Sequence, residues 1–130
     1  MRLVIFLFLI TFTLSANHVS WYGDFNTAHQ EALEQNKMLL VLLIQKDCLT
    51  CKEAIRTSFI NQSYIKEINQ KFISVLITQG QKNSYPIEMF YTSSYPSLFF
   101  LDKHELFICE ALRDDITPKR VQEYLTQCLP

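Results

Sequence analysis

The sequence has 130 residues, a length typical of one domain, and 48% of them are apolar, which is enough for a hydrophobic core. The formal net charge is −1, and acidic and basic residues are mixed along the chain. This charge pattern argues against the broad positive surface that binds nucleic acid or an anionic membrane. With only 2 glycines, the sequence has no glycine-rich loop that could cradle a phosphate.

Residues 1–16 have the pattern of a secretory signal peptide. Arg2 precedes an apolar run, and the small residues Ser15 and Ala16 follow it where a signal peptidase could cut. The run is shorter than the roughly 20 apolar residues of a membrane-spanning helix. We therefore predict an exported, periplasmic protein whose mature domain covers 17–130, with an uncleaved membrane anchor as the alternative.

The first half of the mature chain alternates helical and strand patterns. Apolar residues at three- and four-residue steps predict helices, and continuous apolar runs predict strands buried on both faces. In chain order we expect a helix over 25–36 capped by Asp24 or Asn26, a strand over 38–44, a helix from 49 to about 59, a short helix over 61–70 and a strand over 72–78. A helix between two such strands indicates a βαβ unit with a parallel sheet, hence the α/β class.

The second half predicts a hairpin and a final helix. We expect a loop over 79–84, a helical turn over 87–91, a strand over 97–101, a turn over 102–104 and a returning strand over 105–111. Thr117 and Pro118 are suited to the cap and first position of a helix. The apolar face of that helix would carry Val121, Tyr124, Leu125 and Cys128.

Cys48 and Cys51 stand where the first buried strand runs into a helix. Unpaired N–H groups and the helix dipole at a helix N-terminus favour a thiolate, which is the form that attacks a disulfide. Cys51 is three residues further on and shares the helix face, so it can reach Cys48 and resolve a mixed disulfide. This arrangement predicts a redox-active pair.

Two other interpretations of the pair compete with redox chemistry. A structural zinc site needs four ligands, and no second close Cys/His pair exists; the scattered His18, His29 and His104 fit surface positions better. An inert structural disulfide is disfavoured because the strand-to-helix turn exposes the first cysteine. We therefore predict no metal and no cofactor at the pair.

The sequence resembles the thioredoxin superfamily in three features. Within the superfamily it is most similar to the exported single-domain bacterial proteins. The three features are the strand over 38–44 that leads into the Cys48–Cys51 pair, the strand over 72–78, and Tyr95-Pro96 before the strand over 97–101. The resemblance implies a thioredoxin-like fold with a central mixed sheet flanked by helices and a cis-proline before the C-terminal hairpin.

The resemblance also implies roles for individual residues. Cys48 would attack and Cys51 would resolve. Pro96 would be cis and lie beside the pair, and Tyr95 would offer main-chain groups to an extended substrate peptide.

The chain departs from cytoplasmic thioredoxins at four positions near the pair. Asp47 replaces their tryptophan, Leu49 and Thr50 replace their Gly-Pro, and Leu42 replaces their buried acid. The oxidases and isomerases of the superfamily usually carry histidine where Thr50 stands. These departures leave the direction of electron flow open, with a lean towards reduction.

Cys109 and Cys128 are the other two cysteines. In an exported protein one interpretation is a structural disulfide between them, because the final helix of a thioredoxin-like fold packs on the sheet. The alternative is a buried Cys109 and a free thiol at Cys128.

The sequence thus predicts a monomeric thiol–disulfide oxidoreductase. Its partners would be cysteine-containing exported proteins, with a membrane electron donor as a further candidate and no nucleic acid. The first alternative is a partner-binding module that uses the Pro96 groove and a non-catalytic disulfide. A weaker one is copper handling by two thiolates.

Overall fold

The computed structural model describes residues 17–80, 85–86 and 88–129. The predicted signal peptide and most of the predicted loop over 79–84 lie outside the described residues. The elements are β1 (Trp21–Tyr22), α1 (Phe25–Gln35), β2 (Met38–Ile44), α2 (Leu49–Ser58), α3 (Ile65–Lys71), β3 (Phe72–Thr78), β4 (Ser97–Leu101), β5 (Leu112–Arg113) and α4 (Pro118–Cys128).

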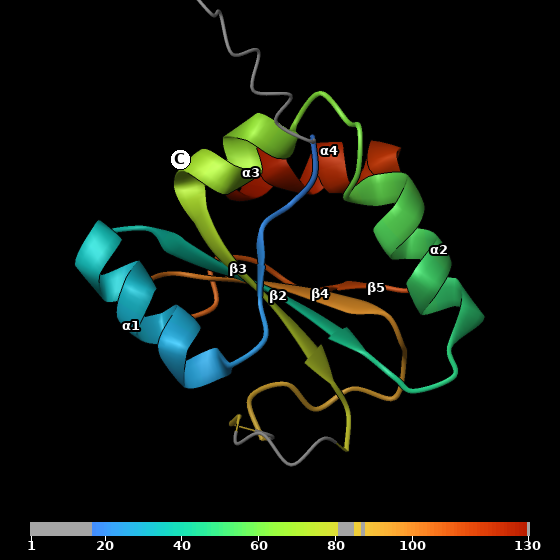
Figure 1. Ribbon diagram of the computed structural model, residues 1–130, viewed down its shortest axis with the longest axis horizontal. Coiled ribbons are helices and arrows are strands. Elements are labelled where there is room, and N and C mark those ends of the chain that lie inside the picture. Colours follow the sequence, from blue (N-terminus) through green and yellow to red (C-terminus); the bar gives the residue numbers. More distant parts are fainter. Residues whose placement is uncertain (1–16, 81–84, 87, 130) are drawn as a thin grey trace, which may run out of the picture.

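The described strands form one mixed sheet in the order β1-β3-β2-β4-β5. Strands β1 and β2 run parallel to β3, whereas β4 runs antiparallel to both β2 and β5. Helix α1 covers one face of this sheet, and α2, α3 and α4 lie on the other (Figure 1). This arrangement is the α/β thioredoxin-like fold, with its helices on both faces of a mixed sheet.

The central strands β2 and β4 supply both halves of the core. Alternate residues of β2 face opposite sides, so Leu40 and Leu42 pack under α2 and α4 while Leu39 and Val41 pack against α1. All five residues of β4 are buried. The continuous apolar run over 38–44 follows from this burial on both faces.

Local capping chemistry fixes the helix ends. The Asp24 carboxylate accepts the N–H of Thr27 at the start of α1, and Asn36 ends that helix in the left-handed conformation. Thr117 caps α4 and Pro118 occupies its first turn, as the sequence predicts.

The structure corrects two predicted elements. The returning strand over 105–111 is wrong: β5 comprises only Leu112–Arg113, and the earlier segment touches β4 through one isolated bridge. The Asp102 carboxylate accepts main-chain N–H groups of the turn, which holds the segment in an irregular loop. Helix α3 begins at Ile65, because Asn61 is left-handed and a turn precedes the helix.

Candidate functional site: a disulfide at the N-terminus of α2

Cys48 is the N-cap of α2. Its extended backbone turns the side chain back over the helix start, where Sγ accepts the main-chain N–H of Cys51 at 3.1 Å. The hydroxyl of Thr50 lies 3.2 Å from the same sulfur. The two cysteines form a disulfide with 5.2 Å between their Cα atoms.

The two sulfurs differ in accessibility. Cys48 is half-buried, whereas Cys51 is 1% exposed and packs under the helix. An incoming thiol or disulfide therefore meets Cys48 first. The partner cysteine is shielded, so it is placed to react within the protein rather than with an external molecule.

Strand pairing brings Tyr95 and Pro96 to the same edge of the sheet. Ser97, the first residue of β4, pairs with Leu43 near the end of β2, and Cys48 follows β2 directly. The Tyr95–Pro96 peptide bond is cis. Thr50, from between the two cysteines, lines one pocket together with these two residues.

The disulfide has an apolar residue on its buried side, and charged residues such as Lys46 and Lys52 flank it on the exposed side. Leu42 stands behind α2 on the buried face of β2 and is completely buried, so no carboxylate occupies that position. Asp47, before Cys48, is exposed and adopts a left-handed backbone. Leu49, between the cysteines, is 81% exposed and gives the rim of the site an apolar side chain.

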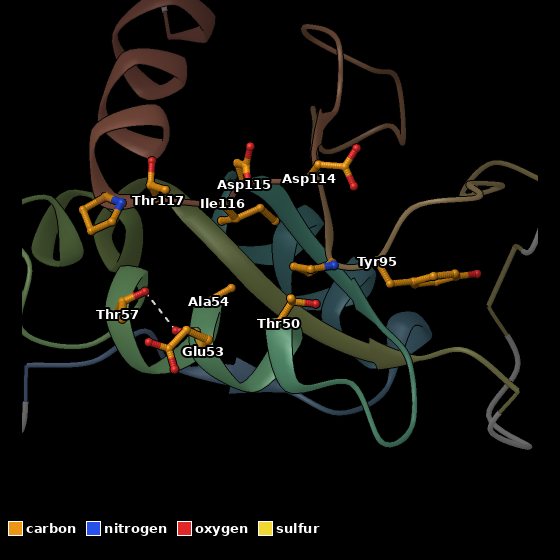
Figure 2. A pocket seen from close by; sticks show the side chains of 11 residues that line it. Thr50, Glu53, Ala54, Thr57, Tyr95, Asp114, Asp115, Ile116 and Thr117 are labelled. Carbon is orange, nitrogen blue, oxygen red and sulfur yellow. Dashed lines mark hydrogen bonds between the residues drawn. The ribbon is translucent and has the colours of Figure 1, made fainter.

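A pocket of about 490 Å³ extends from the disulfide loop along α2. Its opposite wall is the connection from β5 to α4, residues 114–117 (Figure 2). The buried side chains of Ala54, Pro96 and Ile116 line it. It is therefore a partly apolar hollow within reach of a chain that contacts the cysteine pair.

The ring of Tyr95 points away from this pocket (Figure 2). It borders a second hollow, of about 240 Å³, that Tyr85 and Tyr91 also line. Partial burial raises the pKa of the Tyr95 phenol, and the nearby phenols of Tyr85 and Tyr91 raise it further. Tyr95 thus separates two hollows, one lined by aromatic residues and one by residues of α2.

Cys109 and Cys128 form a second disulfide, which joins the loop before β5 to the last turn of α4. Both residues are half-buried and pack against the core on the α4 side of the sheet. Cys109 therefore belongs to a loop and not to the strand on which the sequence pattern placed it.

Within the described residues, no three or more His, Cys, Asp or Glu side chains are grouped as they would be to hold a metal ion. In the same part of the chain, no helix has the length and apolar character needed to span a membrane.

Comparison with known proteins agrees with this geometry. Residues 20–103 match the family model described as thioredoxin-like, and the chain belongs to that family. No curated protein gives a significant match.

Several solved structures share the fold. A DsbH oxidoreductase has 14% sequence identity and a TM-score of 0.63, covering 89% of this chain and 88% of its own. The oxidised C-terminal domain of Neisseria meningitidis DsbD has 15% identity and a TM-score of 0.62, covering 85% and 100%. Thioredoxin f2, solved in complex with ferredoxin:thioredoxin reductase, has 10% identity and a TM-score of 0.61, covering 88% and 97%.

Sequence reasoning missed the far wall of the pocket. Asp114 and Asp115 follow a two-residue strand that has no clear sequence pattern, and both adopt left-handed backbones. Adjacent aspartates tolerate this conformation and were the available signal for a tight turn. Ala54, one of the buried residues of α2, also lines the pocket.

Proposed function

We propose that this protein is an exported thiol–disulfide oxidoreductase that reduces disulfides in other exported proteins. One observation carries the proposal: the more accessible cysteine, Cys48, caps α2 and its sulfur accepts a main-chain N–H, while Cys51 is buried three residues away. The DsbH neighbour is described as an oxidoreductase and the DsbD domain as being in its oxidised form, which supports the same chemistry.

The reaction proceeds in two thiol–disulfide exchanges. The Cys48 thiolate attacks one sulfur of the substrate disulfide, which forms a mixed disulfide and expels the other substrate sulfur as a thiolate. The Cys51 thiolate then attacks Sγ of Cys48, which closes the protein disulfide and releases the second substrate thiolate. The substrate gains two electrons, and the protein dithiol loses them.

We infer the direction from the small number of groups that would stabilise the Cys48 thiolate. An oxidising couple needs a strongly stabilised reduced form. Here the hydrogen-bond contacts of the Cys48 sulfur are one N–H and one hydroxyl. The adjacent Asp47 opposes the thiolate, whereas the exposed Lys46 and Lys52 favour it. We therefore place the couple nearer the reducing end of the superfamily.

Each turnover needs a fresh supply of electrons. We propose that a dithiol donor, soluble or in the membrane, regenerates the reduced form by the same exchange. The complex of thioredoxin f2 with a reductase supports a protein partner of this kind. For export, we expect the mature protein to begin at residue 16 or 17, which N-terminal sequencing of the secreted product would show.

Cysteine replacement tests the proposal. Cys48→Ser should abolish reduction of a protein disulfide, and Cys51→Ser should accumulate a mixed disulfide visible on a non-reducing gel. The Cys109→Ala/Cys128→Ala double variant is the matched control and should keep its exchange activity. A Cys48→Ser protein as active as wild type would overturn the mechanism.

Redox titration of the Cys48–Cys51 couple tests the direction. We expect a potential nearer the roughly −270 mV of reducing thioredoxins than the roughly −120 mV of the strong oxidant DsbA. A value near the oxidising end would leave the exchange chemistry intact and reverse the proposed direction.

A further inference from the structure

The pocket along α2 has the position of a substrate subsite. Thr50 comes from the cysteine loop, and Tyr95 and Pro96 border the same hollow. A substrate chain that brings a sulfur to Cys48 therefore passes the mouth of this pocket. A side chain within a few residues of the reacting cysteine can enter it.

The walls of the pocket combine an apolar interior with acidic rims. Ala54 and Ile116, each 5% exposed, provide apolar surface. Glu53 lies on the α2 rim, and Asp114 and Asp115 lie on the opposite rim (Figure 2). Among the described residues that line the pocket, none is basic.

Two of these three carboxylates are available to a ligand. Glu53 is paired with Arg56 at 2.6 Å on the surface of α2. The carboxylates of Asp114 and Asp115 make no hydrogen bond or ion pair with a described residue. Arg120 donates to the main-chain oxygens of both, at 2.9 and 3.3 Å, so it fixes the loop and offsets part of its charge.

We propose that this pocket selects substrate segments that carry lysine or arginine within a few residues of the target cysteine. The aliphatic stem of such a side chain would pack against Ala54 and Ile116 while its cationic end lies near Asp114 and Asp115. Glutamate in the same place would be repelled. The inference rests on the proposed disulfide exchange and adds to it the charge of the substrate.

Three peptides test the selection. They are identical disulfide-linked dimers except for Lys, Gln or Glu two residues from the single cysteine. The reduced protein is mixed with each, and each rate is divided by the rate with dithiothreitol alone, which removes intrinsic differences in reactivity. At low salt we expect the normalised rate for the Lys peptide to exceed that for the Gln peptide by about threefold and that for the Glu peptide by about tenfold. The factors are small because two exposed ion pairs contribute modestly. The preference should shrink at high salt.

The Asp114→Asn/Asp115→Asn variant should lose the preference. Asparagine accepts the left-handed backbone of both positions, with φ of 57° and 40°, so the loop is retained. Glu34→Gln, on the exposed side of α1, is the matched control and should keep the preference of the wild type.

A neutral small disulfide, 2-hydroxyethyl disulfide, separates this inference from the proposed function. If the protein reduces it and also reduces the Lys and Glu peptides at equal normalised rates, the subsite is wrong and the exchange chemistry stands. If neither the small disulfide nor any peptide is reduced, the proposed function itself is wrong, and the subsite with it. A preference that persists in the double asparagine variant would also overturn the subsite.

Discussion

The Cys109–Cys128 disulfide should contribute a large part of the stability of this domain. It holds the last turn of α4 against the loop that precedes β5. Its removal can be studied by reduction, without replacing Cys109 or Cys128. In a Cys48→Ser/Cys51→Ser background it is the one disulfide left, so the same protein is compared in oxidised and reduced form.

The contribution of this disulfide to the free energy of unfolding follows from the length of the loop that it closes. The two cysteines are separated by 19 positions. A loop of about 20 residues restricts the unfolded chain by about 3 kcal/mol in the loop-entropy model. Since a domain of this size is stable by roughly 5–15 kcal/mol, reduction should remove a substantial fraction of the free energy of unfolding.

Urea unfolding followed by tryptophan fluorescence measures this difference. Trp21 is the single tryptophan, and its ring lies 5.2 Å from that of Phe59, so its emission reports loss of the core. With a urea slope of about 1–3 kcal/mol/M, the midpoint should fall by about 1–3 M on reduction. Coincident curves for the two forms would refute the reasoning.

Two smaller changes test the packing and capping around α2 and α4. Tyr64→Phe removes the hydrogen bond from the buried phenol to the carbonyl of Ser58 and should cost about 1 kcal/mol in urea unfolding. Burial raises the pKa of Tyr64 above its usual value near 10, so the folded state holds this proton longer. Wild-type stability should therefore fall as pH rises above 10, more steeply than that of Tyr64→Phe; equal slopes would contradict this. Thr117→Ala removes the cap that accepts the N–H of Arg120 and should cost about 1 kcal/mol, whereas Thr126→Ala within the same helix should cost clearly less; equal losses would contradict the capping role.

The central elements could be predicted because their signals are local. The run over 38–44 is apolar at every position, and only burial on both faces explains that pattern. The starts of α1 and α4 carry cap residues, Asp24 and Thr117, whose preferences are nearly independent of context. Strand β1 was missed because Trp21–Tyr22 is too short to show any periodicity.

The hairpin could not be placed because its register depends on one side chain. Residues 105–111 are rich enough in apolar side chains to suggest a strand. Asp102 instead accepts two turn N–H groups, and Glu105 adopts a left-handed backbone. The chain rejoins the sheet only at Leu112, which pairs with Leu98. Sequence periodicity contains no information on this local competition for hydrogen bonds.

One part of the candidate site could be predicted from the sequence, and the other part could not. The Cys48–Cys51 pair is a local motif, since a helix start and a spacing of three residues define it. The pocket beside it joins α2 to a loop some 60 positions later, and left-handed residues shape that loop. Only the tertiary structure brings Ala54 and Asp114 to one hollow.

The chemistry of the disulfide also depends partly on local sequence and partly on tertiary surroundings. A helix start accounts for the proposed attack by Cys48, because one main-chain N–H already points at its sulfur. The potential depends on everything else around the sulfur. The Thr50 hydroxyl lies 3.2 Å from it, and the buried residue of β2 behind the helix is the apolar Leu42. Since a more stabilised thiolate makes a couple more oxidising, the reducing direction proposed above requires that this environment stabilise the thiolate only weakly. Replacement of Thr50 by a residue that donates to sulfur as a cation, Thr50→His, should raise the potential, and an unchanged or lower value in the redox titration would contradict this account.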